Sequence, residues 1–155
     1  YKPLLFKSVI LGVSGKIGYV TGLGDKVTQS QRFNLGGRDV RGFGSGGIGP
    51  RDKGSSDAVG GNKMYAGTFE VVSNLGLDKD TGVRWTVFTD FGSLWGTDYP
   101  SGVTKPNAAN MRLSAGVGIF WSTAIGPLSF SWAKPLSKMA HDTPKTFQFN
   151  IGTRL

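Results

Sequence analysis

Few residues of this 155-residue chain have the types and spacing that catalysis requires. The chain contains no cysteine and one histidine, which excludes disulfides, thiolate chemistry and a histidine-rich metal site. His141 lies in a Met-Ala-His-Asp-Thr-Pro stretch typical of a loop, where a solvated histidine is far more common than a catalytic base. The sequence suggests no nucleophile paired with a base. We therefore predict that the chain is not an enzyme and has no cofactor and no metal site.

A glycine-rich segment could instead bind a phosphate. Gly44-x-Gly46-x-x-Gly49 has the spacing of a dinucleotide fingerprint. That fingerprint must end a strand and open a helix, whereas Pro50 follows here and no helical periodicity appears. The segment is more typical of a loop.

The formal net charge of +8 is compatible with nucleic acid, an acidic surface or anionic lipid head groups as a partner. Lysine and arginine are concentrated in presumed loops and strand ends, and they form no run of five or six like charges. We expect these side chains to be solvated loop charges, and we predict no nucleic-acid partner.

The elements that must position any site are β-strands. The chain has 25 glycines, 7 prolines and 12% aromatic residues, a composition that argues against a helical bundle and against disorder. Apolar and polar residues alternate with period two in several segments, most clearly between Asn110 and Trp121. We predict six strands, over residues 6–19, 63–72, 83–95, 110–121, 128–133 and 147–155, with a tight turn at 124–127.

The strand pattern favours a transmembrane β-barrel over a soluble sandwich. The strands reach the length that a tilted membrane-spanning strand needs, and aromatic residues lie near their ends. No run of 18 apolar residues is present, so a transmembrane helix is excluded. The faces opposite the apolar ones carry polar residues, as a barrel lumen would: Glu70, Arg84, Asp90, Arg112, Gln148, Asn150 and Arg154. Residues 20–62 break the rhythm and form a long loop with little alternation, which is usual for functional or disordered connections.

Four ordered segments resemble a known family. The loop carries Val40-Arg41-Gly42-Phe43, similar to the Val-Arg-Gly-Phe/Tyr motif of the outer-membrane assembly and two-partner secretion superfamily. Phe88-Thr-Asp90-Phe-Gly92-Ser-Leu-Trp95 resembles its Phe-x-Asp-x-Gly-x-x-Trp strand. Residues 115–136 resemble the penultimate hairpin of its assembly branch. A segment containing Phe147, Phe149, Ile151 and Gly152 resembles the family's seam strand, which closes the barrel.

The resemblance implies an all-β antiparallel barrel fragment. Residues 1–155 would be the C-terminal portion of a sixteen-stranded barrel, roughly its last six strands, with 20–62 as a long extracellular loop folded into the lumen. Tyr1 in place of an initiator methionine agrees with a piece of a longer protein, and the periplasmic POTRA domains would lie outside it. Leu155 departs from the aromatic residue that commonly ends such strands.

The same resemblance suggests a role for the loop arginine. Arg41 is expected in the lumen between the carboxylates of Glu70 and Asp90, which lie on the polar faces of two neighbouring strands. A guanidinium can bridge two carboxylates through charge-assisted hydrogen bonds. The expected role is conformational, and the alternative is that Arg41 is a solvated loop charge.

Three functions remain open from the sequence. The first is the folding and insertion of other outer-membrane proteins, with client strands added at the seam. Its implied partners are outer-membrane lipids and lipopolysaccharide, unfolded outer-membrane protein clients, accessory assembly lipoproteins and, because six strands leave two open edges, another copy of the chain. The second is a secretion pore of the same superfamily. The third is a soluble β-barrel that binds an anionic ligand through its basic loops.

Overall fold

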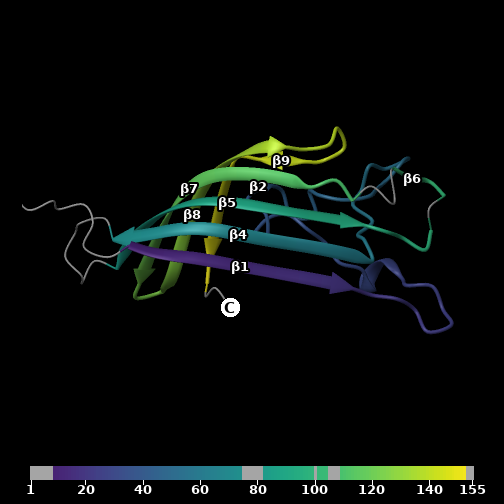
Figure 1. Ribbon diagram of the computed structural model, residues 1–155, viewed down its shortest axis with the longest axis horizontal. Helices are drawn as coiled ribbons and strands as arrows, with labels where there is room; N and C mark the ends of the chain where they lie inside the picture. The colour runs from purple at the N-terminus through teal and green to yellow at the C-terminus, as the bar shows by residue number, and fades with distance from the viewer. Residues whose placement is uncertain (1–8, 75–81, 100, 105–108, 153–155) are drawn as a thin grey trace, which may run out of the picture.

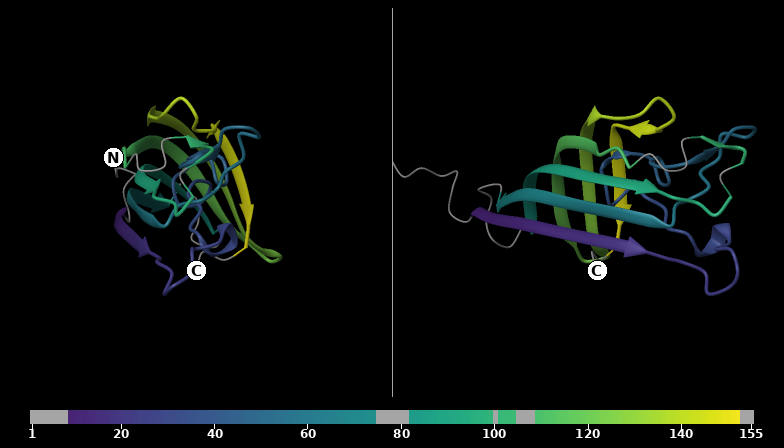
Figure 2. Two further views of the ribbon diagram at one scale, coloured as in Figure 1. Left: turned by 90° about the vertical axis from the view of Figure 1, so that its right-hand side faces the viewer. Right: turned by 45° about the vertical axis from the view of Figure 1, so that its right-hand side comes forward.

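The computed structural model describes residues 9–74, 82–99, 101–104 and 109–152 as one antiparallel six-stranded sheet with loops gathered at one end (Figure 1). The strands are β1 (Val9–Tyr19), β4 (Lys63–Asn74), β5 (Val83–Trp95), β7 (Arg112–Thr123), β8 (Gly126–Ser137) and β10 (Phe147–Ile151). Each pairs with the next in the order β1-β4-β5-β7-β8-β10. Figure 2 shows the sheet curling around the loop that follows β1. Within the described residues β1 and β10 are its two edges, and they do not pair with each other.

The outer face of the sheet is apolar from edge to edge. One register row crosses all six strands and contains only apolar side chains: Leu11, Val71, Val87, Val117, Trp132 and Phe147. Most of these side chains are exposed, including Leu11 at 77% and Val117 at 52%. Because side chains alternate between the faces of a strand, the polar partners face inward. The row Ser14, Thr68, Asp90 and Ser114 lies on that inner face, and Asp90 and Ser114 are fully buried.

The predicted fold class, an all-β antiparallel sheet of about six strands, is confirmed. The predicted strand 83–95 coincides with β5, and the other strands overlap their predictions. The prediction for 128–133 was too short, because β8 begins at Gly126 directly after a two-residue turn and continues to Ser137. The predicted strand ends at 6–8 and at 153–155, with Arg154 and Leu155, lie outside the described residues, as do 75–81 between β4 and β5. No helix in the part of the chain that the structure describes is long and apolar enough to cross a membrane.

The loop 20–62 is more ordered than its sequence predicts. It contains the 3₁₀ turn η1 (Gln29–Gln31) and two short strands, β2 (Gly42–Phe43) and β3 (Arg51–Asp52). β2 pairs with β9 (Pro144–Lys145), and β3 pairs with β6 (Val103–Thr104). Both partners are distant in sequence, so no local alternation encodes them.

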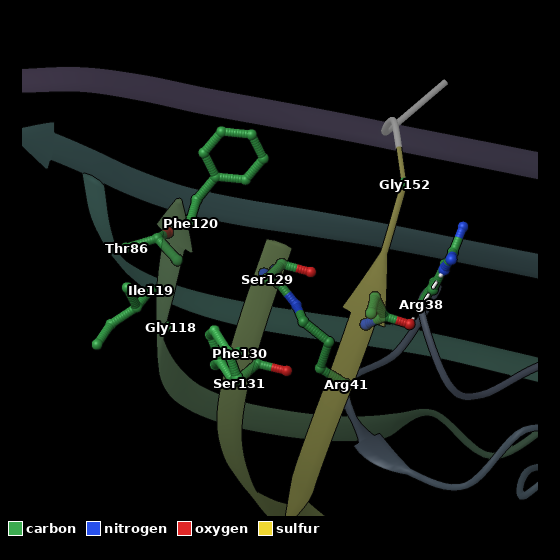
Figure 3. A pocket seen from close by; sticks show the side chains of 11 residues that line it. Arg38, Arg41, Thr86, Gly118, Ile119, Phe120, Ser129, Phe130, Ser131 and Gly152 are labelled. Carbon is green, nitrogen blue, oxygen red and sulfur yellow. Dashed lines mark hydrogen bonds between the residues drawn. The ribbon is translucent and has the colours of Figure 1, made fainter. Parts of the chain in front are cut away.

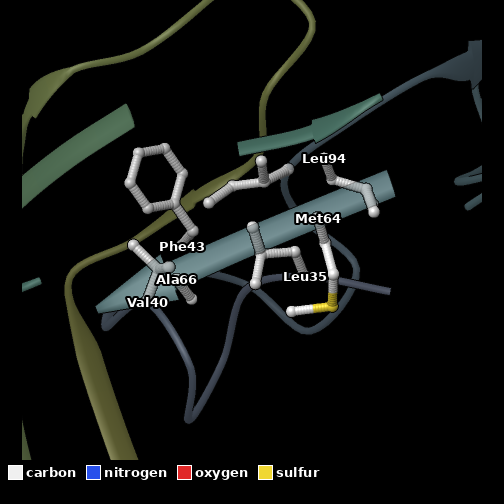
Figure 4. Close-up of a cluster of buried hydrophobic side chains, with 7 residues drawn as sticks. Leu35, Val40, Phe43, Met64, Ala66 and Leu94 are labelled. Atoms are coloured by element: carbon white, nitrogen blue, oxygen red, sulfur yellow. The ribbon is translucent and has the colours of Figure 1, made fainter. Parts of the chain in front are cut away.

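The loop is packed onto the inner face by an apolar cluster, so this face carries apolar side chains beside the predicted polar ones (Figure 4). The loop contributes Leu35, Val40, Phe43 and Ile48, while β4 contributes Met64 and Ala66 and β5 contributes Leu94. All seven side chains are at most 6% exposed. Burial of their apolar surface stabilises the folded-back position of the loop.

Candidate functional site

The centre of the site is an ion pair between the loop and the inner wall of the sheet. Asp90 projects inward from β5 and is fully buried. Arg41 donates from Nε to Asp90 Oδ2 at 2.7 Å and from Nη2 to Oδ1 at 2.8 Å. The backbone N–H of Arg41 also donates to Oδ2, at 2.9 Å. A single carboxylate therefore fixes both the side chain and the backbone of the loop arginine.

Two further groups surround the guanidinium of Arg41. Its Cζ lies 3.3 Å from the centre of the Phe88 ring, a cation–π contact. Glu70, which pairs with Phe88 across β4 and β5, places Oε2 3.7 Å from Arg41 Nη1. The structure thus brings Arg41 next to both carboxylates that the sequence singled out, with a direct fork to Asp90 and a longer ionic contact to Glu70.

Gly42 lets the loop backbone reach the wall. Its φ of 93° lies in the left-handed region, and a Cβ there would be 3.1 Å from the Ser114 Cβ and 3.3 Å from the Ala133 Cβ. The Ser114 hydroxyl donates a hydrogen bond to the Arg41 carbonyl. Only glycine satisfies both the backbone angle and the narrow space between β7 and β8.

The loop also holds the inner face of β10. Gln148 donates from Nε2 to the Phe43 carbonyl at 2.7 Å, and Arg38 donates from Nε to Asn150 Oδ1 at 3.2 Å. The remaining predicted seam residues face outward or lie at the strand end. Phe147, Phe149 and Ile151 are exposed, and Gly152 follows the strand with a φ of 117°. The two phenylalanine rings contact Trp132 and Phe130 of β8, at centroid distances of 5.2 and 5.0 Å.

The predicted strand motif of β5 shapes the same wall. Phe88 lies under Arg41, while a Cβ at Gly92 would come within 3.0 Å of Val40 and 3.2 Å of Leu35. Gly92 therefore leaves the space that the loop fills. Trp95 faces away from the site and packs edge-on against Tyr65 at 5.9 Å.

A cavity of about 120 Å³ lies between the loop and strands β7, β8 and β10 (Figure 3). Arg38, Arg41, Ser129, Ser131 and Asn150 line it, with Arg38 bonded to Asn150. None of these side chains forms a nucleophile–base pair. Among the described residues, no three His, Asp or Glu side chains are grouped so that they could hold a metal ion.

The expectation of solvated loop charges was wrong for several arginines. Arg32 is buried and donates to the Val59 and Val27 carbonyls. Arg51 donates to three carbonyls, among them that of His141 at 2.7 Å. Both residues are structural because their guanidinium groups replace missing backbone partners inside the folded loop.

Sequence reasoning also missed a second buried ion pair. Arg112 at the start of β7 forms a fork with Asp142, at 2.9 and 3.1 Å. Arg112 belongs to the predicted polar face, but its partner lies in a loop 30 residues away that had no strand pattern. The only feature of the sequence that pointed to this pair was the acidic residue Asp142 itself, next to His141.

Backbone N–H groups lower the pKa of one loop carboxylate, that of Asp52. The N–H groups of Ser55 and Gly54 donate to the Asp52 carboxylate and lower its pKa from the usual value.

The glycine-rich segment 44–49 leads into β3 and not into a helix, so its geometry is not that of a dinucleotide fingerprint.

Comparison with known proteins agrees with this architecture. The profile of the Omp85 superfamily domain matches residues 1–155. The chain is 34% identical over 146 residues to the outer membrane protein assembly factor BamA of Neorickettsia risticii, covering 94% of the chain and 19% of that protein. It is 31% identical over 175 aligned positions to BamA of Neisseria meningitidis serogroup B, covering 96% of the chain and 22% of that protein. It therefore spans about a fifth of the length of these relatives.

A solved structure has the same fold. The crystal structure of BamA from Haemophilus ducreyi lacking POTRA domains 1–3 superposes with a TM-score of 0.79 at 33% identity. The match covers 91% of this chain and 30% of that one. With the superfamily profile matched along its whole length, the chain belongs to the Omp85 superfamily.

Proposed function

We propose that this chain is the C-terminal barrel portion of a bacterial outer-membrane assembly factor, a protein that folds and inserts other β-barrel proteins. The observation that carries the proposal is the position of the Val-Arg-Gly-Phe loop, held by the Arg41–Asp90 pair against the inner wall of a sheet whose outer face is apolar. The similarity to BamA proteins along nearly the whole chain supports it.

The apolar outer face fits contact with lipid. A spanning sheet must offer apolar side chains to the acyl chains and keep its polar groups on the other face. The row from Leu11 to Phe147 meets the first condition, and the row that contains Asp90 and Ser114 meets the second. We place the chain in the outer membrane, with 20–62 as an extracellular loop folded into the lumen and the POTRA domains in another part of the protein.

The terminal strand fits a role in receiving client strands. β10 pairs with β8 on one side only within the described residues, so its other edge offers unpaired backbone groups. An unfolded client strand could add there by β-augmentation. The exposed Phe147, Phe149 and Ile151 would keep the outer face apolar beside the incoming strand.

The site of Arg41 performs no chemistry on a client. Its guanidinium is occupied by Asp90, the Phe88 ring and Glu70, so its role is to hold the loop in the lumen. The partners that this function requires are outer-membrane lipids and lipopolysaccharide, unfolded barrel clients and accessory assembly lipoproteins. The open edges at β1 and β10 also allow the isolated chain to associate with itself.

The proposal is tested with the full-length protein that contains this chain, reconstituted in lipid vesicles. We expect it to accelerate the folding of an urea-denatured β-barrel client, followed by the change in electrophoretic mobility that accompanies barrel formation. Vesicles without the protein are the control. No acceleration, together with export of an unfolded passenger across the bilayer, would identify a secretion pore instead.

A further inference from the structure

The buried pair of Arg112 and Asp142 is not used by the site described above. Arg112 donates from Nε and Nη2 to the two carboxylate oxygens of Asp142, and from Nη1 to the Asn110 carbonyl at 2.7 Å. The Asp142 side chain is fully buried, and Arg112 is 1% exposed. Asp142 Oδ2 also accepts the Met139 N–H at 2.7 Å, so this carboxylate organises the whole turn around it.

The turn that Asp142 organises lies directly against the loop motif. Thr143 accepts the Gly44 N–H and donates its own N–H to the Gly47 carbonyl, each at 2.9 Å. The next two residues form β9 and pair with Gly42 and Phe43. Residues 139–145 therefore link the wall strand β7, through Arg112, to the loop motif.

The same turn leads directly into the terminal strand. Phe147 follows Asp142 by five residues, and Gln148 bonds the Phe43 carbonyl. The loop motif is thus held from two sides. The Arg41–Asp90 pair fixes it to β5, and the segment 139–145 fixes it to the beginning of β10.

We propose that Arg112 and Asp142 form a positioning pair that couples the folded-back loop to the terminal strand. Without this pair, residues 139–145 lose their side-chain attachment to β7, and the pairing of β2 with β9 is no longer fixed relative to the wall. The loop motif and β10 are then coupled only by the contacts between the loop and β10 itself, such as the hydrogen bond from Gln148 to the Phe43 carbonyl. The structural role of the pair does not depend on the proposed function. Its effect on client folding does rest on that function, because β10 is the strand at which clients would be received.

An ion pair suits a positioning role better than a merely stabilising one. Replacing a buried ion pair by apolar residues is often neutral for stability, whereas a bidentate fork fixes one relative geometry of the two segments. An apolar replacement of the pair is therefore expected to leave the protein folded but to free residues 139–145 from their fixed position relative to β7. A folding measurement alone does not detect this change.

The experiment uses a disulfide as a distance gauge in the full-length protein, with any cysteines outside this chain replaced by serine. Gly44 and Thr143 are changed to cysteine, because a Cβ at Gly44 would lie 3.8 Å from the Thr143 Cγ2 and Gly44 has no left-handed φ. The rate of disulfide formation is measured per folded molecule in Asp142→Asn and in the apolar double variant Arg112→Met/Asp142→Leu.

A control variant removes a different ion pair, which joins β1 to the loop 20–62. Lys16 contacts Asp39 at 2.7 Å, but the Lys16 side chain is exposed and that of Asp39 is only half-buried, so Lys16→Met should leave the disulfide rate unchanged. We expect a rate at least fivefold lower in both test variants. We also expect the preformed disulfide to restore client folding in the apolar double variant.

Rates within twofold of the parent in both folded test variants would overturn the positioning pair. So would a loss of client folding that the preformed disulfide does not restore. If the rates fall as expected while the parent protein itself accelerates no client folding, the positioning pair stands and the proposed function fails.

Discussion

Arg41 shows how one side chain can hold a loop of 43 residues against a wall. Its side chain donates two hydrogen bonds to Asp90 and its backbone N–H donates a third, while Glu70 lies a full ångström farther from the guanidinium than Asp90 does. The two carboxylates are therefore not equivalent. Asp90 fixes geometry, and Glu70 adds a second negative charge to the surroundings of Arg41.

The first prediction follows from that inequality. Asp90→Asn should destabilise the folded-back loop by roughly 3–5 kcal/mol, because it removes the charged partner that forms the fork with the buried guanidinium. Glu70→Gln should cost only about 1 kcal/mol. Protease cleavage within residues 20–62 of the membrane-embedded protein measures both effects, and Lys16→Met, which removes a partly exposed ion pair, is the control. A larger effect of Glu70→Gln would contradict this assignment.

A second prediction concerns the glycine next to Arg41. Gly42→Ala should cost about 1–3 kcal/mol, since the residue combines a left-handed φ with crowding against Ser114 and Ala133. Gly44→Ala is the matched control, because its nearest new contact would be at 3.7 Å. Denaturant unfolding of the two variants provides the comparison, and equal midpoints would show that the close approach of the loop is not required.

At the scale of elements, alternation decides which face each strand turns outward. Val117 lies in the middle of the apolar row, between Val87 and Trp132, and Ser129 lines the inner cavity. Val117 and Ser129 lie on opposite faces of the sheet, because successive side chains along a strand alternate between its two faces.

A third prediction uses this difference. Val117→Lys should destabilise the membrane-inserted protein by about 2–4 kcal/mol, because it places a charge among acyl chains. Ser129→Lys should have a smaller effect, since its ammonium group can be hydrated on the inner face. The folded fraction in lipid vesicles measures both, and the reverse order would mean that the sheet faces have been assigned wrongly.

Alternation also explains which elements could be predicted from the sequence. The strand 83–95 was predicted residue for residue because its period-two pattern is local. The two short strands of the loop were not, since β2 pairs with residues about a hundred positions later. The Arg112–Asp142 pair was missed for the same reason, whereas Arg41 was expected beside Asp90 because a motif resemblance implied a folded-back loop and strand alternation put Asp90 on a polar face. Contacts between residues that are distant in the sequence produce no alternation pattern from which they could be predicted.

At the scale of the whole molecule, the sheet is inverted relative to a soluble domain. Its exposed face carries large apolar side chains, and its buried face carries Asp90, Arg112, Ser114 and Gln148 together with the apolar cluster under the loop. A contiguous exposed apolar surface of this kind is rare on soluble monomers.

The fourth prediction concerns this surface. The purified chain should be β-rich and monodisperse only when detergent micelles are present, because micelles cover the outer face. Far-UV circular dichroism and light scattering, with and without micelles, measure this dependence. The detergent-corrected mass also shows whether copies pair through their open edges. Monodispersity in plain buffer would instead support a soluble β-barrel.

The most direct test of the account is the structure of the full-length protein in lipid nanodiscs by electron cryo-microscopy. The account predicts that Arg41 is within hydrogen-bond distance of Asp90 on the lumenal wall, and that Val117, Trp132 and Phe147 face the lipid. A loop 20–62 extended away from the lumen, or an apolar row packed inside the protein, would contradict it.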